Sequence, residues 1–241
     1  MTAPTPMDPV AQPVRLLIVD DDPLVRAGLA LMLGGADDID IVGEAADGSE
    51  VADLVDRLRP DVVLMDIRMP TMDGLTATEA LRTRPDAPEV IVLTTFHADE
   101  QVLRAIRAGA AGFVLKDTSP AQIVDSVRRV AAGDPVLSPA VTRRLMARAA
   151  GTGPGGGRVD RADRARRRIA TLADREREVA IAVGRGRSNA EIAAALYLSV
   201  ATVKTQVSRI LARFDFNNRV QIALLVHDAG LLDDDGAGLA T

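Results

Sequence analysis

The chain contains no cysteine, and aromatic residues make up only 2% of its 241 residues. Without cysteine, neither a disulfide nor a thiolate metal site can hold the fold together, which fits a reducing compartment. With so few aromatic rings, leucine, valine, isoleucine and alanine must supply nearly all of the buried surface. Such a core suits helices packed on a parallel sheet. The length allows one large or two modest domains.

Long apolar runs are also missing from the chain. No run approaches the ~20 residues that a bilayer-spanning helix needs. Residues 1–13 (MTAPTPMDPVAQP) have neither the basic segment nor the apolar core of a secretory signal. We therefore expect a cytoplasmic protein that has no membrane partner.

Lysine is nearly absent as well. Of the 29 basic residues, 27 are arginine and only Lys116 and Lys204 are lysine. Lysine offers a compact point charge where arginine offers a wide planar fork, so a site built for one rarely accepts the other. An arginine-rich composition leaves a few lysines by chance, and the context of each lysine must decide between chance and function.

Charge is distributed unevenly along the chain. Residues 1–157 hold 15 basic and 23 acidic side chains (−8), residues 158–219 hold 14 and 7 (+7), and residues 220–241 hold none and 4 (−4). An acidic first part joined to a basic second part predicts that the second part binds a polyanion. The glycine-rich residues 151–157 between the two parts predict a flexible linker.

Before that linker, apolar runs of strand length alternate with segments of helical period. The runs predict strands near residues 16–19, 39–42, 62–65, 90–93 and 113–115, and the segments predict helices near residues 23–33, 48–58, 74–83, 99–108 and 120–132. Five strand–helix repeats predict a doubly wound α/β fold with a five-stranded parallel sheet covered on both faces.

After the linker the pattern is purely helical. Helices are expected near residues 174–184, 189–196, 200–214 and 218–227. Ser188 and Glu191 have the spacing of a capping box, and Ser199 can cap the next helix. That helix has one apolar stripe and a polar outer face. A short capped helix, a turn and such a longer helix predict an all-α helix-turn-helix domain that binds the major groove of DNA.

Polar residues follow the predicted strands of the first part. Asp20 and Asp21 follow the first strand, Asp66 the third, Thr94 the fourth and Lys116 the fifth. In a doubly wound parallel sheet these ends share one edge, where ligands bind. Crowded carboxylates repel each other unless a cation joins them, and oxygen ligands favour Mg²⁺, which makes a phosphoryl group the natural substrate.

This set, with the segment LMDIRMPTMDG, resembles the receiver domain of two-component response regulators over residues 14–133. The resemblance implies a flavodoxin-like fold with Asp66 as phosphoacceptor; Asp20, Asp21, Asp66 and the backbone carbonyl of Arg68 as Mg²⁺ ligands; Lys116 as partner of the aspartate or phosphoryl group; and Thr94 with Phe113 as switch pair. The chain departs from the family at Asp117, where many receivers have proline. Asp22 adds a third acidic residue to the first loop, and we expect it to act as a helix N-terminal charge.

Residues 172–232 resemble the DNA-binding domain of LuxR/NarL-type (NarL/FixJ) regulators over nearly their whole length. The resemblance implies that Lys204, Thr205 and Ser208 face base edges or groove phosphates, that Thr202, Gln206, Arg209 and Arg219 are candidate backbone contacts, and that Val220, Leu224 and Leu225 form a dimer surface. A solvated helix face is the competing interpretation for each polar residue, and it has least weight for Lys204.

The segment before this domain, residues 158–168, is rich in arginine. It could touch DNA phosphates, although a solvated linker is the favoured interpretation. It could also run as a helix into the first helix of the domain. That helix has Ala173 where the family often has a capping threonine, and Asp174 is the other candidate cap.

The predicted organisation has five parts. They are a disordered tail at 1–13, a receiver domain at 14–133, a linker at 134–171 with a helix near 139–149, a helix-turn-helix domain at 172–232 and a tail at 233–241. We interpret the chain as a DNA-binding response regulator, not an enzyme. A sensor histidine kinase would phosphorylate Asp66 with Mg²⁺ as cofactor, and double-stranded DNA would be bound by a homodimer, at least in the phosphorylated or DNA-bound state.

Two alternatives stay open at this point. A LuxR-type transcription factor whose DNA binding does not depend on phosphorylation would have the same residues. An aspartyl-phosphate phosphohydrolase would share the carboxylates and the lysine, but it usually needs a second acid/base aspartate two residues after the nucleophile, where this chain has Arg68.

Overall fold

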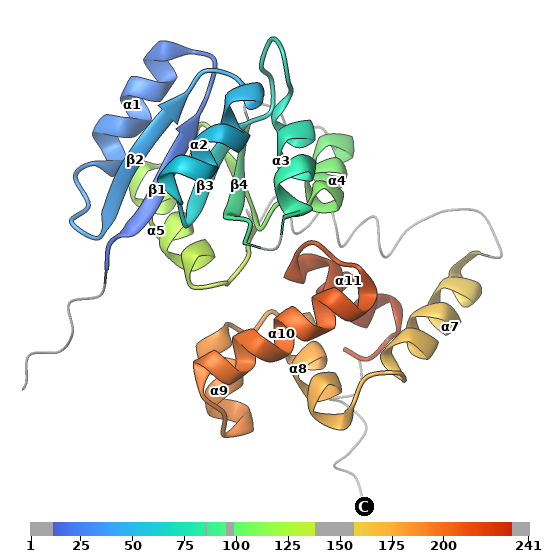
Figure 1. Cartoon of the computed structure of the whole chain (residues 1–241). Coiled ribbons are helices and arrows are strands. Elements are labelled where there is room, and N and C mark those ends of the chain that lie inside the picture. The colour runs from blue at the N-terminus through green and yellow to red at the C-terminus, as the bar shows by residue number, and fades with distance from the viewer. Residues whose placement is uncertain (1–11, 85, 95–98, 138–156, 233–241) are drawn as a thin grey trace, which may run out of the picture.

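The computed structural model describes residues 12–84, 86–94, 99–137 and 157–232. These residues form an α/β domain and a helical domain that lie against each other (Figure 1). The strands of the first domain are β1 (Val14–Val19), β2 (Ile39–Ala45), β3 (Val62–Asp66), β4 (Glu89–Thr94), β5 (Gly112–Leu115) and β6 (Val136–Leu137). Its helices are α1 (Pro23–Leu33), a 3-10 turn (Gly48–Glu50), α2 (Val51–Leu58), α3 (Gly74–Arg82), α4 (Asp99–Ala108) and α5 (Pro120–Ala131).

The strands form one parallel sheet in the order β2-β1-β3-β4-β5-β6. The strand order reverses between β1 and β3, which is where doubly wound sheets bind ligands. Val19 of β1 lies opposite Met65 of β3, so the residues that follow, Asp20 and Asp66, emerge side by side at the carboxyl edge. This arrangement confirms the predicted α/β doubly wound fold.

Helices cover both faces of the sheet, as the aliphatic strands predict. One face packs against α1 and α5, and the opposite face packs against α2, α3 and α4 (Figure 1). The strand residues between the two layers are aliphatic and almost completely inaccessible, as burial on both faces requires. The sheet is therefore a rigid platform for whatever stands at its carboxyl edge.

Local capping sets where two of these helices begin. The Asp22 carboxylate accepts the N–H groups of Leu24 and Val25 and caps α1, as we expected for this third acidic residue. The Asp47 carboxylate caps the 3-10 turn that precedes α2 by accepting the Ser49 N–H. The single helix predicted near 48–58 therefore begins as a 3-10 turn.

The helical domain contains α7 (Gly157–Ile169), α8 (Asp174–Gly184), α9 (Asn189–Leu196), α10 (Val200–Phe214) and α11 (Arg219–Asp228). Ser188 and Glu191 form the predicted capping box of α9, and the Ser199 hydroxyl caps α10. Ala173 precedes α8 without a side-chain cap, and Asp174 does not replace it. Instead, the Glu176 carboxylate accepts the Ala173 N–H.

Both domains extend into residues 134–171, which the sequence pattern assigned to a linker. Val136 and Leu137 form β6, a sixth strand that pairs with β5. The arginine-rich segment forms α7, which packs on the helical domain and ends at Ile169, before α8 begins. The helix predicted near 139–149, most of the glycine-rich stretch, residues 1–11 and the tail at 233–241 lie outside the described residues. In the described part of the chain, no helix has the length and apolar character to cross a membrane.

Candidate functional site

The carboxyl edge of the sheet brings together two carboxylates and an ammonium. The Lys116 Nζ lies 2.6 Å from Asp20 Oδ2 and 2.8 Å from Asp66 Oδ1. The Asp20 side chain is fully buried, and the Asp66 and Lys116 side chains are 8% and 17% exposed. The sheet topology explains this convergence, because Asp20 follows β1, Asp66 ends the neighbouring β3, and Lys116 follows β5, one strand beyond β4, at the same carboxyl edge.

The environment shifts the pKa values of two of these groups. Burial raises the pKa of Asp66, and the repulsion from Asp20 adds to that rise, although Lys116 and the Arg68 N–H act in the opposite direction. Burial alone would lower the pKa of Lys116, but the hydrogen bonds and charges of the two carboxylates raise it overall. Lys116 is therefore held firmly as a cation, and the Asp66 carboxylate is poorly solvated. A poorly solvated carboxylate beside a fixed cation is suited to accept an electrophile.

The predicted metal ligands are only partly gathered in this structure. Among the residues described, no three acidic or histidine side chains are grouped as a bound metal requires. Asp21 is exposed on an open depression that Arg68 also lines, rather than joined to the Asp20–Asp66 pair. The donor chemistry nevertheless fits a hard divalent cation, because the Asp20 and Asp66 carboxylates share a single ammonium and the exposed Asp21 carboxylate directly follows Asp20 in the chain. The Arg68 N–H donates to Asp66 Oδ2 at 2.8 Å, so this backbone is already in place beside Asp66.

The predicted switch pair occupies the strands next to this site. Thr94 ends β4 and is 3% exposed, and its backbone carbonyl accepts the Lys116 N–H at 2.9 Å. Phe113 lies in β5 and is 1% exposed, within the core between the sheet and α4. Its ring already points inward in this structure.

Two residues shape the loop after Asp66: Asp47, which sequence reasoning missed, and Gly74, which belongs to the LMDIRMPTMDG segment already identified. Asp47 follows β2, and its carboxylate accepts the N–H groups of Thr71 at 2.8 Å and Met72 at 3.2 Å. The hydrogen bonds from the Ser49 N–H and hydroxyl, together with those from Thr71 and Met72, lower the pKa of Asp47 to about 2. Gly74 starts α3 directly against the Asp66 backbone, where a Cβ would overlap the Asp66 carbonyl oxygen. The Asp-Gly dipeptide after the second predicted strand was the available sequence signal for Asp47.

The residues predicted to read DNA lie on the outer face of α10. Thr202, Lys204, Thr205, Ser208 and Arg209 are all exposed. Two of them make only local hydrogen bonds: the Thr205 hydroxyl donates to the Ala201 carbonyl, and the Thr202 hydroxyl pairs with Ser199. Gln206 is half-buried. This face is therefore polar and free of strong internal partners, as a binding surface must be.

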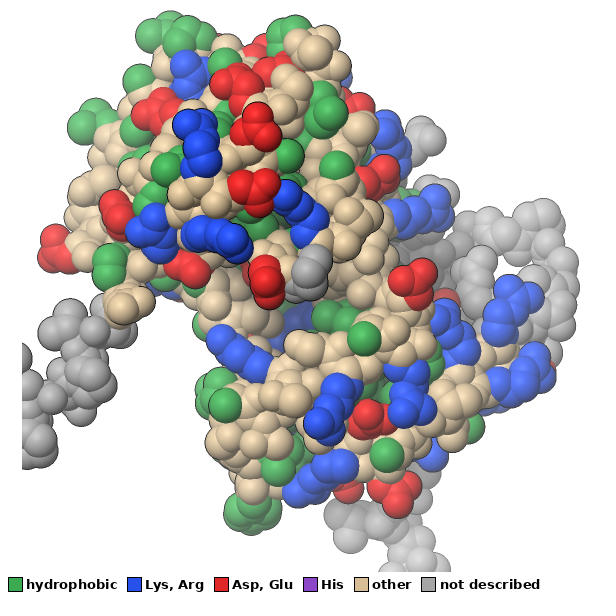
Figure 2. Space-filling view, viewed as in Figure 1, with side chains coloured by type: hydrophobic (Ala, Val, Ile, Leu, Met, Phe, Trp, Pro, Cys, Tyr) green, Lys and Arg blue, Asp and Glu red, His purple; other side chains and the backbone are tan. Residues whose placement is uncertain are grey.

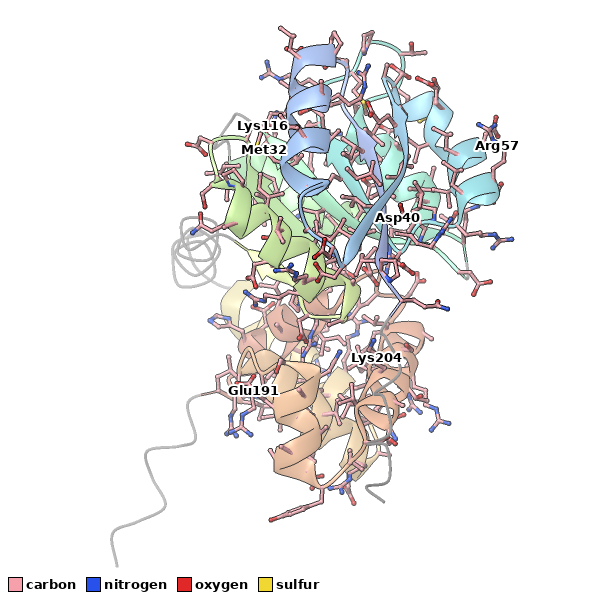
Figure 3. The ribbon with its side chains drawn as sticks, turned by 90° about the vertical axis from the view of Figure 1, so that its left-hand side faces the viewer. Met32, Asp40, Arg57, Lys116, Glu191 and Lys204 are labelled. Carbon is pink, nitrogen blue, oxygen red and sulfur yellow. The ribbon has the colours of Figure 1, made fainter. Side chains whose placement is uncertain are left out.

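Part of that face looks towards the α/β domain. Lys204 and Ser208 line a cavity of about 220 Å³ whose opposite wall includes Gly133 and Pro135. In Figure 3, Lys204 lies beside the junction of the two domains, whereas Lys116 lies in the upper part of the α/β domain, away from the helical domain. Gly133 has a φ of +87°, and a Cβ there would stand 2.9 Å from Asn189 Nδ2. The two domains thus approach closely at this glycine.

A buried arginine holds the domains together at this junction. The Arg219 Nη1 donates to the Asp134 carboxylate, to the Gly133 carbonyl and to the Asn189 side-chain oxygen, each at 3.0 Å. Its Nη2 donates to the Arg187 carbonyl at 2.6 Å. Arg219 is 7% exposed, and burial lowers its pKa although Asp134 opposes that shift. This candidate DNA contact is therefore engaged by the α/β domain instead.

Asn218 joins the ends of two helices from different domains. Its Oδ1 accepts the Gln221 N–H and caps α11. Its Nδ2 donates at 2.8 Å to the carbonyls of Ile106 and Ala110, at the end of α4. One amide thus satisfies the first turn of α11, a carbonyl in the last turn of α4 and a carbonyl just after that helix.

The predicted dimer surface on α11 is occupied in this structure. Val220 is 5% exposed and packs with the core beneath α4, as does the half-buried Leu224. Leu225 is 8% exposed and belongs to the core of the helical domain itself. The sequence pattern could not show which of these residues pack against the α/β domain and which against the helical domain, because all three are apolar and lie within two turns of one helix.

Two parts of the chain match known protein families. Residues 16–128 match the family described as response regulator receiver domain, and residues 170–226 match the bacterial regulatory proteins of the luxR family. The transcriptional regulatory protein LiaR of Bacillus subtilis is 36% identical over 214 residues, which cover 89% of this chain and 97% of LiaR. The response regulator protein VraR of Staphylococcus aureus is 33% identical over 219 residues, which cover 91% of this chain and 99% of VraR.

A solved structure is similar to just over half of this chain. It is a two-component response regulator of the LuxR family from Aurantimonas sp., with 31% sequence identity and a TM-score of 0.53. The similarity covers 56% of this chain and 96% of that one.

Proposed function

The chain belongs to the two-component response regulators that join a receiver domain to a LuxR-type DNA-binding domain, and from this premise we propose that Asp66 is its phosphoacceptor. The observation that carries the proposal is the Lys116 ammonium, which lies 2.8 Å from Asp66 and 2.6 Å from Asp20 at the carboxyl edge of the sheet. The relatives LiaR and VraR carry the names of a transcriptional regulatory protein and a response regulator. The donor would be a sensor histidine kinase.

The chemistry assigned to the site is a single phosphoryl transfer. An Asp66 oxygen attacks the phosphorus, a P–O bond forms, and the bond from phosphorus to the donor breaks, with the electron pair leaving on the donor. Lys116 offsets the negative charge of the phosphoryl oxygens, and the Thr94 hydroxyl is the proposed donor to the attached group. A bound Mg²⁺ would supply further positive charge; we assign it to the Asp20, Asp21 and Asp66 carboxylates and the Arg68 carbonyl.

We propose that α4 carries the change from the site to the helical domain. This helix begins five residues after Thr94. At its other end, the Ile106 carbonyl in its last turn and the Ala110 carbonyl just beyond it accept hydrogen bonds from the Asn218 amide. A shift of Thr94 towards a phosphoryl group would move the start of α4. If the far end of α4 moved with it, the hydrogen bonds between Asn218 and the carbonyls of Ile106 and Ala110, which we call the Asn218 joint, would be strained. Release of that joint would free Lys204 and Ser208 from the interdomain cavity and uncover Val220 and Leu224.

The free helical domain would bind double-stranded DNA through α10. The contacts that we assign are Thr202, Lys204, Thr205, Ser208 and Arg209. Of these, Lys204 is the one that we assign to the base edges. One helix-turn-helix contacts few base pairs, so a homodimer on paired half-sites is expected. Val220 and Leu224 become available for such a dimer only when α11 leaves the receiver. We place this function in the cytoplasm.

The phosphohydrolase alternative finds no support at the site. The residue two positions after Asp66 is Arg68, whose side chain cannot act as the second acid/base carboxylate. We therefore propose regulation of transcription, not catalysis, as the function.

Intact-mass analysis tests the phosphoacceptor. The chain is incubated with a small-molecule phosphodonor and Mg²⁺, and we expect a phosphoryl adduct that Asp66→Asn does not form. Asp56→Asn is the matched control, because Asp56 is an exposed aspartate of α2 that pairs with Arg84; it should form the adduct as the wild type does. An adduct on Asp66→Asn, or none on the wild type, would contradict the proposal. In the latter case phosphorylation-independent DNA binding becomes the better interpretation.

A further inference from the structure

The arginine-rich helix α7 packs as an integral part of the helical domain, although it precedes the residues that match the luxR family. Ala165 and Ile169 are 3% and 1% exposed in the core of that domain. The Arg166 Nε donates to the Ala229 carbonyl at 3.0 Å, beyond the end of α11. One side of α7 is thus fixed by apolar burial and by a hydrogen bond.

Arg168 ties α7 to the end of the proposed recognition helix, α10. Its guanidinium lies 4.8 Å from the ring centres of both Phe214 and Phe216, and its Nη2 donates to the Phe214 carbonyl at 2.8 Å. Two cation–π contacts and a hydrogen bond make this a well-anchored side chain. The orientation of α7 relative to α10 is therefore set by the structure rather than left to a linker.

Two further arginines of α7 point away from the core. A helix turns by about 100° per residue, so Arg164 lies one turn before Arg168 on the side of α10, and Arg167 lies on the outer face. Both are exposed, and neither has an ion-pair partner among the residues whose side chains the structure describes, which begin at Ala162 in this helix. Asp163, in contrast, pairs with Arg166 at 3.7 Å.

The surface between α7 and α10 continues this positive charge. Arg213 stands on the exposed side of α10, and its Nη1 donates to the Thr171 carbonyl at 2.8 Å, just after α7. Arg209 lies one turn earlier on α10 and is exposed. Figure 2 shows Lys and Arg side chains prevailing over acidic ones across α10 and α7 on the face in view.

We propose that α7 is a second DNA-binding element of this chain, with Arg164 and Arg167 contacting phosphates that flank the groove occupied by α10. The proposal rests on the proposed function of α10. The backbone of a docked helix is already ordered before it binds, so only the arginine side chains lose freedom, and phosphate oxygens match the guanidinium geometry. Because such contacts read no sequence, α7 would strengthen binding to any duplex and extend the footprint at one end of each half-site.

The salt dependence of DNA binding tests this element. The full chain, treated with phosphodonor and Mg²⁺, is titrated against a fluorescently labelled random-sequence duplex at several KCl concentrations. For Arg164→Gln/Arg167→Gln, the slope of log K against log [KCl] should lose about 2 in magnitude for each protomer bound, since each phosphate contact contributes roughly 0.9. If the variant and the wild type bind equally at 1 M KCl, this slope difference corresponds to a loss of affinity of roughly 60-fold per protomer at 0.1 M KCl.

Arg57→Gln/Arg59→Gln is the control, because it removes the same charge from two exposed arginines of the receiver. It should leave slope and affinity near those of the wild type. Circular dichroism should show that both double variants keep the helix content, since glutamine forms helices nearly as well as arginine. An unchanged slope for the α7 variant overturns the inference and points to an acidic protein partner or to solvated arginines. An equal loss in the control also overturns it, because net charge alone would then explain the effect. Failure of the wild type to bind any duplex would instead refute the DNA-binding function itself.

Discussion

Each of the two lysines stands at one end of the proposed signalling path. The Lys116 ammonium fits between two carboxylates at 2.6 and 2.8 Å, in a site where its side chain is 17% exposed. The planar fork of arginine needs more room and a different geometry. Lys116→Arg should therefore lose most of the phosphorylation-driven gain in DNA affinity, measured by anisotropy with and without phosphodonor.

Lys204→Arg provides the comparison at the other site. Lys204 is exposed on α10, and arginine also contacts guanine and phosphate, so this change should alter DNA affinity by only a few-fold. If both substitutions leave the response unchanged, the scarcity of lysine reflects composition alone and the role assigned to Lys116 is wrong.

Asp47 makes a prediction about pH. Its pKa is about 2 in the folded chain, chiefly because of hydrogen bonds from Ser49, against 3.8 for an ordinary aspartate. A depressed pKa contributes stability that is present above the unfolded value and is lost as pH falls through the folded value. Asp47→Ala should therefore be less stable than the wild type by a constant amount near neutral pH. Urea midpoints should show that gap shrinking below about pH 4; a gap that is independent of pH would contradict the assignment.

At the residue scale, the sequence predicted the position of a side chain wherever the topology of the sheet determines that position. Asp20, Asp66 and Lys116 follow parallel strands, and the rule that such ends share an edge was enough to predict their meeting. No comparable rule predicts Arg219. An arginine at a helix start is usually solvated or bound to phosphate, and only the neighbouring domain shows that it is buried. The individual roles of these residues stay predictions.

Elements were predictable where the local pattern decides the structure. The α9 capping box and the Ser199 cap were confirmed, because the side chains that satisfy the free N–H groups lie within three residues in sequence. The short strand β6 and the docking of α7 were missed. A strand of two residues is too short to show an alternating hydrophobic pattern. In α7 the many arginines obscure the two buried apolar positions, Ala165 and Ile169, that fix the helix to the domain.

Asn218 allows a test at the scale of elements. Serine caps helices about as well as asparagine, but it cannot reach two carbonyls across the domain junction. Asn218→Ser should therefore preserve α11 and lose the two hydrogen bonds to the end of α4. At about 1 kcal/mol for each bond, the DNA affinity of the unphosphorylated chain should rise by about tenfold or more.

Asn218→Ala separates this effect from the cap. It removes the cap as well and should lower the thermal stability of the helical domain, at a cost of about 1 kcal/mol, in addition to raising DNA affinity. Equal DNA affinity for Asn218→Ser and the wild type would show that the joint with α4 does not hold the domains together.

At the scale of the whole molecule, the arrangement of the domains had no signal in the sequence. The family was predictable because each domain carries its own motifs, and the similarity to LiaR and VraR confirms it. The junction depends on Asn189, Asn218 and Arg219, polar residues that a sequence pattern assigns to solvent. An interface of buried polar groups is also easy to open, because water can replace each partner once the surfaces part.

Asp134 tests whether that junction controls the shape of the molecule. Its carboxylate accepts the Arg219 Nη1 at 3.0 Å and the Asn189 N–H at 2.9 Å, and the Arg219 side chain is only 6% exposed. Asp134→Asn leaves a buried guanidinium without a counter-charge, at a cost of about 3 kcal/mol or more. Separation of the domains returns Arg219 to water, so the variant should relieve this cost by opening rather than by unfolding. Small-angle scattering of the unphosphorylated chain should show a larger radius of gyration, and circular dichroism should show unchanged helix content.

The control is Asp125→Asn, which changes an exposed aspartate of α5 and should keep the compact form. A compact Asp134→Asn chain that merely melts at lower temperature would show that Arg219 stabilises the fold and does not act as the latch between receiver and DNA-binding domain.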